Sequence, residues 1–202
     1  MQSARPDLAE IARPMQELTR AIATDRDAWT PERVAQMTAL FDSAASGWQE
    51  RDMPERHDAI ADALARGGPF PPGWCIEVGS GTGNSTGDLR RAFHDVVSLD
   101  LSSEMLRLAS HTGRQVQSDA SALPIRSRSA SVVALVNMFL FPGEIARTLA
   151  DDGVLLWVST NGDQTPIYLP PADVLDALPG AWDGTTAEAG WGTWLTARRL
   201  RT

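Results

Sequence analysis

The spacing of apolar residues changes near residue 67. Before that point, apolar residues recur every three or four positions in two stretches, "TPERVAQMTALF" and "PERHDAIADALARGG". This spacing is typical of helices with one buried face. Thr30 as N-cap and Pro31 at the first helical position suit the start of the first helix, and Gly67 suits the end of the second. The pattern predicts a helical cap over residues 1–66.

After residue 67, short apolar runs alternate with stretches of helical period. The expected strands are "WCIEV", "VVSLD", "RQVQSD", "SVVALVN" and "GVLLWVST", and the expected helices are "STGDLRRAF", "SSEMLRLAS", "GEIARTLA" and "PPADVLDAL". A further stretch, "TTAEAGWGTWLTARRL", predicts two strands joined at Gly190–Gly192. Alternating strands and helices predict parallel strands with right-handed crossovers. Residues 67–202 are therefore expected to form an α/β core with seven strands and helices on both faces.

A glycine-rich loop follows the first expected strand, in "CIEVGSGTGNSTG". Glycine allows a tight turn and a close approach of the backbone to a ligand, because it has no Cβ. The spacing is E-x-G-x-G-x-G from Glu77 to Gly83, and the dinucleotide pattern G-x-G-x-x-G is not met. A purely structural turn is the alternative interpretation of this loop.

Two aspartates end the next two expected strands. Asp100 stands about twenty residues after the loop, where an acid can accept hydrogen bonds from ribose hydroxyls. An N-cap role is its alternative, although Ser102 and Ser103 already suit that role. Asp119 ends the third strand and is placed to accept a hydrogen bond from the exocyclic amine of an adenine. Three neighbouring strands thus end in groups suited to one nucleoside ligand.

With these motifs the stretch from Trp74 to Val158 resembles the class I S-adenosylmethionine-dependent methyltransferases. The resemblance implies a Rossmann-like sheet with an antiparallel last strand, S-adenosylmethionine as cofactor and S-adenosylhomocysteine as product. It implies that the first motif surrounds the methionine and ribose, and that two later motifs hold the ribose and adenine. The residues concerned are Glu77, Gly79, Ser80, Gly81 and Gly83, then Asp100, Leu101 and Met105, then Asp119 and Ala120.

Composition excludes several other classes of function. The chain has no lysine among its 18 basic residues, so it can form neither a Schiff base with pyridoxal phosphate nor a Walker-type phosphate loop. Its formal charge of −8 disfavours nucleic acid as a partner. The single cysteine, Cys75, precludes an internal disulfide, and no apolar run is long enough for a membrane span or a signal peptide. We expect a cytoplasmic protein, a monomer or homodimer, without a metal site.

Methyl transfer from a sulfonium is an in-line displacement that depends mainly on positioning, and a base is needed only if the acceptor must lose a proton. Of the three histidines, His94 and His111 follow helices that run away from the ligand edge of the sheet. His57, in the expected cap, is therefore the candidate base, with a solvated helix-surface histidine as its alternative. Asn137, at the end of the fourth strand, is expected to face the sulfonium and the acceptor.

Aromatic and apolar side chains mark the expected acceptor pocket: Phe41, Trp48, Met138, Phe139 and Tyr168. A place in the core is the alternative for Phe139. With no basic tract and no recognition insertion, the expected acceptor is a small organic molecule, with oxygen, nitrogen and carbon acceptors all open. Two other functions remain open: a methyltransferase-like protein that catalyses a non-methylating reaction such as cyclisation, and one that only binds the cofactor.

The assignment of Asp100 to the ribose gives a test. Asp100→Ala is expected to weaken S-adenosylmethionine binding by roughly 1–3 kcal/mol, because buried hydrogen bonds to the sugar are lost. Calorimetric titration with S-adenosylmethionine, S-adenosylhomocysteine and NAD measures this effect and tests the nicotinamide alternative. An unchanged affinity would show that the ribose lies elsewhere.

Overall fold

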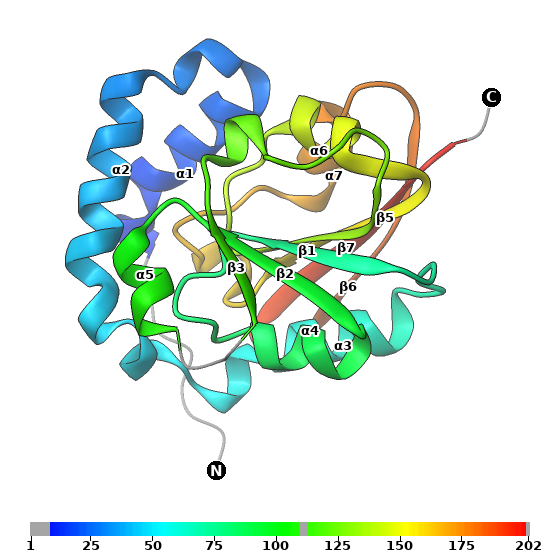
Figure 1. The fold of residues 1–202 in the computed structure, drawn as a ribbon, viewed down its shortest axis with the longest axis horizontal. Helices are drawn as coiled ribbons and strands as arrows, with labels where there is room; N and C mark the ends of the chain where they lie inside the picture. Colours follow the sequence, from blue (N-terminus) through cyan, green and yellow to red (C-terminus); the bar gives the residue numbers. More distant parts are fainter. Residues whose placement is uncertain (1–8, 110–112, 201–202) are drawn as a thin grey trace.

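The computed structural model describes residues 9–109 and 113–200. Its centre is a seven-stranded sheet in the order β3-β2-β1-β4-β5-β7-β6 (Figure 1). The strands β1 to β5 run parallel to one another, whereas β7 runs antiparallel to both β5 and β6. Their bounds are β1 Trp74–Val78, β2 Asp95–Asp100, β3 Arg114–Gln117, β4 Ala130–Val136, β5 Leu149–Ser159, β6 Trp182–Ala189 and β7 Gly192–Arg199. The expected α/β class and the antiparallel last strand are confirmed.

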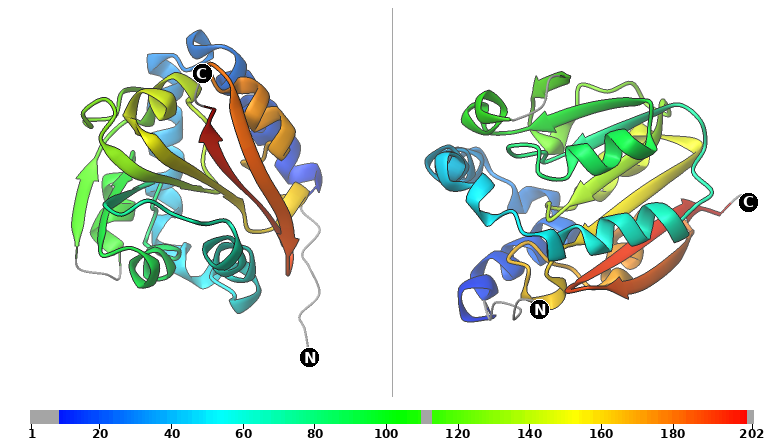
Figure 2. Two further views of the ribbon diagram at one scale, coloured as in Figure 1. Left: turned by 90° about the vertical axis from the view of Figure 1, so that its right-hand side faces the viewer. Right: turned by 90° about the horizontal axis from the view of Figure 1, so that it is seen from below.

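Helices lie on both sides of the sheet (Figure 2). The α-helices are α1 Ala9–Thr24, α2 Pro31–Ala44, α3 Asp58–Arg66, α4 Thr86–Ala92, α5 Ser103–Leu108, α6 Pro142–Thr148 and α7 Pro171–Ala177. Short 3-10 turns are η1 Arg26–Ala28, η2 Ala45–Gly47, η3 Gln49–Arg51, η4 Pro54–Arg56, η5 Ala120–Ala122 and η6 Gly162–Gln164. Thr30 caps α2 by accepting a hydrogen bond from the Arg33 amide, as its sequence context predicts.

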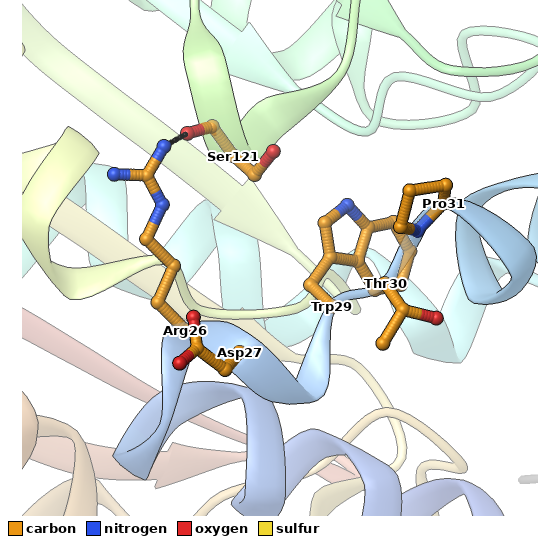
Figure 3. A pocket seen from close by; sticks show the side chains of 6 residues that line it. All are labelled: Arg26, Asp27, Trp29, Thr30, Pro31 and Ser121. Atoms are coloured by element: carbon orange, nitrogen blue, oxygen red, sulfur yellow. Dashed lines mark hydrogen bonds between the residues drawn. The ribbon is translucent and has the colours of Figure 1, made fainter.

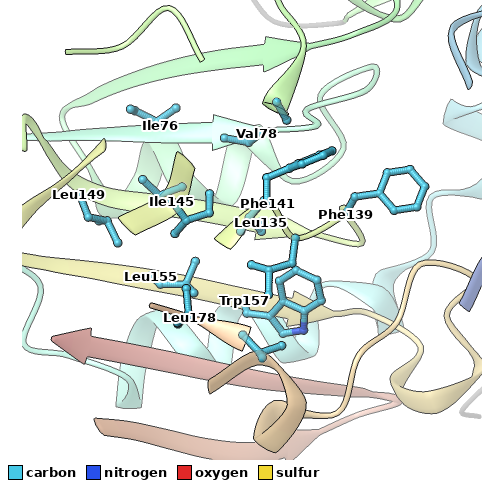
Figure 4. Packing of buried hydrophobic residues seen from close by; sticks show 14 of the residues in the cluster. Ile76, Val78, Leu135, Phe139, Phe141, Ile145, Leu149, Leu155, Trp157 and Leu178 are labelled. Carbon is cyan, nitrogen blue, oxygen red and sulfur yellow. The ribbon is translucent and has the colours of Figure 1, made fainter. Parts of the chain in front are cut away.

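Successive side chains of each strand point to opposite faces of the sheet, where they pack in two separate hydrophobic cores. On one face, Ile76 and Trp157 pack with residues of α1, α6 and α7, and the aromatic rings of this core are seen in Figure 4. On the other face, Cys75 and Leu156 pack with α3 and α4. The sheet is therefore a middle layer, which explains why its parallel strands read as almost continuous apolar runs.

The N-terminal helices occupy two different positions. Helix α3 lies against the sheet, with Ala59, Ile60 and Ala63 fully buried in the second core. Helix α2 stands instead beyond the carboxyl ends of the strands, at the left in Figure 1. Its Asp42 accepts hydrogen bonds from the Ser102 hydroxyl and the Glu104 amide at the start of α5. The expected division into a cap over residues 1–66 and a core over residues 67–202 stays a prediction.

Among the described residues, no helix is both long and apolar enough to cross a membrane.

Candidate cofactor-binding site

The glycine loop after β1 has a conformation that depends on glycine. Gly79, Gly81 and Gly83 have φ values of +74°, +55° and +88°, in the left-handed region that side chains disfavour. The amides of Gly79 and Ser80 both donate to the Leu99 carbonyl of β2, at 2.8 and 3.0 Å. The loop is thus attached to the neighbouring strand, and its turn lies at the carboxyl edge of the sheet.

Glu77 lies beneath this loop and is almost completely buried. One carboxylate oxygen accepts hydrogen bonds from Thr86 Oγ1 at 2.6 Å and from Ser98 Oγ at 2.8 Å. Burial, with the charges of Asp100 and Asp88, raises the pKa of Glu77 to about 7, although the two hydroxyl hydrogen bonds act in the opposite direction. Glu77 therefore connects β1, β2 and α4 under the turn.

Asp100 ends β2 beside the same loop. Its Oδ2 accepts from the Gly81 amide at 2.7 Å, and its Oδ1 accepts from the Ser102 amide at 2.8 Å. Burial raises the pKa of Asp100, while these backbone N–H groups act to lower it. Only 9% of the residue is exposed. A carboxylate has about four lone-pair positions, so both oxygens keep capacity for further donors.

Asp119, after β3, caps the turn η5 by accepting from the Ser121 amide at 2.8 Å. Both of its carboxylate oxygens also accept from Trp29 Nε1, at 3.0 and 3.1 Å. The Trp29 ring packs against Phe139 and Phe141, with centroid distances of 5.6 and 5.4 Å. Nothing in the sequence pattern associates Trp29 with Asp119, since 90 positions separate them.

The chemistry of this edge fits a nucleoside that carries an amino-acid tail. Three left-handed glycines leave backbone without Cβ atoms, and two carboxylates stand at the ends of adjacent strands. The Ser80 hydroxyl in the loop is buried without a hydrogen-bond partner in the structure, as expected for a group that a polar ligand satisfies. Three further residues that the sequence assigns to this site lie nearby. Met105 is buried with its sulfur facing Gly81, and Ala120 is buried in η5. The Leu101 carbonyl accepts a hydrogen bond from the Gln117 side chain.

Comparison with protein families agrees with this arrangement. Residues 76–157 match a family model described as a methyltransferase domain. The match covers 82 of the 202 residues of the chain. Two structures of similar fold are described as complexes with S-adenosylhomocysteine or S-adenosylmethionine, in agreement with the predicted cofactor. No curated protein sequence gives a significant match to this chain.

Solved structures share its fold at low sequence identity. A structure titled as the DhpI complex with S-adenosylhomocysteine is 20% identical, with a TM-score of 0.66, over 82% of this chain and 96% of that one. A Thermotoga maritima S-adenosylmethionine-dependent methyltransferase, described as a possible histamine N-methyltransferase, is 14% identical, with a TM-score of 0.63, over 81% and 100%. An S-adenosylmethionine-dependent methyltransferase of Aquifex aeolicus is 13% identical, with a TM-score of 0.58, over 84% and 98%.

Asn137, expected to face the acceptor, is engaged with the end of β5. Its side-chain amide donates to Thr160 Oγ1 at 2.9 Å, and its carbonyl oxygen accepts from the Thr160 amide at 2.9 Å. Its φ is +51°, which asparagine tolerates better than most residues. Asn137 thus joins the carboxyl ends of β4 and β5, and its expected role in catalysis and cofactor binding stays a prediction. Thr160 as its partner was not foreseen.

His57, the candidate base, lies between two aspartates. Its Nδ1 is 2.6 Å from Asp88 Oδ2 and its Nε2 is 3.0 Å from Asp52 Oδ1, and Arg91 also pairs with Asp88. Burial acts to lower the pKa of His57, but the hydrogen bonds and charges of Asp88 and Asp52 outweigh burial and raise it. These groups line a hollow of about 440 Å³ together with Met53 and Pro54. Its role as base stays a prediction.

Of the other two histidines, one lies in the part of the chain that the structure describes. His94 follows α4 with a side chain that is 97% exposed, as expected for the opposite rim. His111 lies outside the described residues. Among the described residues, no cluster of three or more His, Cys, Asp and Glu is arranged to hold a metal ion.

The residues expected around the acceptor lie in three places. Phe41 and Trp48 pack edge to face at 6.0 Å, and the Trp48 indole nitrogen lies 3.2 Å from the position of a Cβ added to Gly81. The Met138 side chain covers Gly79. Phe139 is buried in the first core and contacts Trp29, whereas Tyr168 follows η6. Their assignment to an acceptor pocket stays a prediction.

The raised pKa of Glu77 predicts a pH-dependent stability. The folded state binds the proton more tightly, so the contribution of Glu77 is fully present below its ordinary value of 4.5 and is lost as the pH rises through about 7. Over this range, wild type should lose about 3 kcal/mol of unfolding free energy relative to Glu77→Gln. Denaturant titrations at several pH values measure the difference, with Glu104→Gln as control. Parallel curves for wild type and Glu77→Gln would contradict the assignment.

The position of His57 predicts the pH range in which it stabilises the fold. Because its pKa is raised, its attraction to the aspartates is fully present below 6.5 and is lost as the pH rises through the higher folded value. His57→Gln should therefore be less stable than wild type at mildly acidic pH, with a gap that narrows at alkaline pH. Thermal unfolding across pH measures this gap. A difference in unfolding temperature between wild type and His57→Gln that does not depend on pH would contradict this prediction. Full turnover of the variant would exclude His57 as the base.

Proposed function

We propose that this methyltransferase transfers the methyl group of S-adenosylmethionine to a small organic molecule. The observation that carries the proposal is the convergence of the glycine turn, Asp100 and Asp119 at one edge of the sheet. The indole rings of Trp29 and Trp48, here called the aromatic cover, lie next to this edge. Trp29 and Trp48 of that cover approach Asp119 and the loop. Because Trp48 lies over the loop, the site suits an acceptor small enough to enter beneath this ring.

The proposed roles follow from the hydrogen-bonding capacity of each group. Asp100 would accept from the ribose hydroxyls, since each of its oxygens already serves one backbone amide and retains a lone pair. Asp119 would accept from the adenine amine. The glycine loop would approach the methionine end, with Glu77 holding the turn in shape from below. Leu101, Met105 and Ala120 would border the adenine.

When bound, S-adenosylmethionine supplies an electrophilic methyl group attached to a sulfonium. The work left to the protein is to hold the acceptor atom in line and to exclude water. Asn137 and Met138, at the carboxyl end of β4, are the residues proposed to face the reacting atoms. Trp48 would close the site from the opposite side, with Arg51 5.0 Å over its ring.

The charge of the chain supports a small acceptor. The net charge is −8, and acids such as Asp42 and Asp52 lie on the segments that border the site. An acidic macromolecule would be repelled by this surface. Structures of similar fold include a phosphoethanolamine N-methyltransferase of Haemonchus contortus, which is 13% identical. We further propose a cytoplasmic protein that works as a monomer or homodimer.

A second candidate function keeps the cofactor and lacks methyl transfer. Both ring nitrogens of His57, the candidate base, already lie within hydrogen-bond distance of aspartates, so His57 is not a ready proton acceptor. This observation favours either an acceptor that needs no base or a non-methylating reaction such as cyclisation.

Methyl transfer can be tested with mixtures of acceptors. S-adenosylmethionine with an isotopically labelled methyl group is incubated with pools of small amines, phenols and carbon acids. Formation of S-adenosylhomocysteine should require an acceptor and should drop by about tenfold or more in Asp100→Asn, because loss of a buried charged hydrogen bond weakens the complex. Glu104→Gln, on the exposed surface of α5, is the matched control. Cofactor binding without product in any pool would favour the second candidate.

A further inference from the structure

Trp29 presents to Asp119 the same kind of donor that an adenine presents. Its indole N–H is shared between both carboxylate oxygens, and its ring packs on Phe139 and Phe141. An adenine held by the same carboxylate would likewise offer an N–H donor and a flat ring. With the Ser121 amide as a further donor, three of the roughly four lone-pair positions of Asp119 are in use.

We infer that Trp29 occupies the adenine subsite and must leave Asp119 before the cofactor binds fully. The inference rests on the proposed adenine role of Asp119. It makes Trp29 an internal competitor of the nucleoside: the hydrogen bond from Trp29 stabilises the closed cover, and the cofactor displaces it.

The surroundings of Trp29 provide room for this displacement. A hollow of about 310 Å³ lies directly beside its ring and is lined by Arg26, Asp27, Trp29, Thr30, Pro31 and Ser121 (Figure 3). A cavity of about 150 Å³ is enough to hold benzene, so this space suits an indole ring. Across the hollow, Arg26 of η1 donates a hydrogen bond of 3.4 Å to the Ser121 carbonyl of η5.

The neighbouring helix is held more firmly than the turn that carries Trp29. Asp42 of α2 accepts hydrogen bonds from Ser102 and Glu104 at the start of α5. The three residues of η1 are not fully buried, and of these three Ala28 packs against the first core, as does Trp29. The displacement therefore needs only η1 and the Trp29 side chain to move, with α2 remaining in place.

The test compares Trp29→Phe with wild type by calorimetric titration of S-adenosylhomocysteine. The variant keeps an aromatic ring against Phe139 but has no N–H to compete for Asp119. We expect its dissociation constant to fall by about tenfold, the equivalent of one hydrogen bond to a charged group. Trp182→Phe, which removes an indole hydrogen bond to the Pro179 carbonyl at the start of β6, should leave the constant unchanged. Equal or weaker binding by Trp29→Phe would overturn the inference.

A second measurement follows Trp29 directly in the wild-type protein. Incorporation of 5-fluorotryptophan labels seven positions, and the fluorine resonance missing from Trp29→Phe, or from Trp29→Tyr if the first variant does not fold, belongs to Trp29. S-adenosylhomocysteine should move this resonance strongly. A resonance that stays fixed while the ligand binds would overturn the inference and leave the proposed function intact. Absence of binding by both wild type and Trp29→Phe would overturn both.

Discussion

The site depends on the attachment of the glycine turn to the end of β2. Two amides of the loop share the Leu99 carbonyl, and a third donates to Asp100. Beneath them, Glu77 joins the loop's own strand to β2 and to the first turn of α4. These bonds hold the backbone in left-handed conformations and keep Asp100 beside it. A nucleoside with a charged tail can then be bound by groups that need little rearrangement, which reduces the entropic cost of binding.

Burial of the two acids that make these hydrogen bonds costs electrostatic free energy. Glu77 and Asp100 are both buried, burial raises the pKa of each carboxyl, and the charge of Asp100 raises that of Glu77 further. Two buried acids on adjacent strands destabilise the fold at neutral pH unless donors compensate for them. The fold supplies hydroxyls to one acid and backbone amides to the other. Keeping both acids at a functional edge is the kind of local cost that binding sites commonly carry.

Much of this arrangement could be predicted from the sequence, because it is set by local patterns. The strands, the helices between them and the glycine turn follow from periodicity and glycine spacing, and Asp100 and Asp119 follow from their places at strand ends. The missed features are all long-range contacts of polar side chains. The partnership of Trp29 with Asp119, of Asn137 with Thr160 and of His57 with Asp88 each joins segments whose separation in the chain carries no periodic signal. The pairs of Trp29 and His57 depend on how the N-terminal segment packs on the sheet, and the pair of Asn137 depends on the register of β4 against β5. Local propensity determines neither.

The contact between Asp42 and α5 makes a helix of the sheet region depend on an N-terminal helix. With six residues, α5 is too short to persist by its own backbone bonds, and part of its cap comes from α2 through Ser102 and the Glu104 amide. Helix α2 thus helps to support the part of the chain that follows Asp100. A shortened protein that begins at β1 would lack the two hydrogen bonds of Asp42, and its α5 would be less stable.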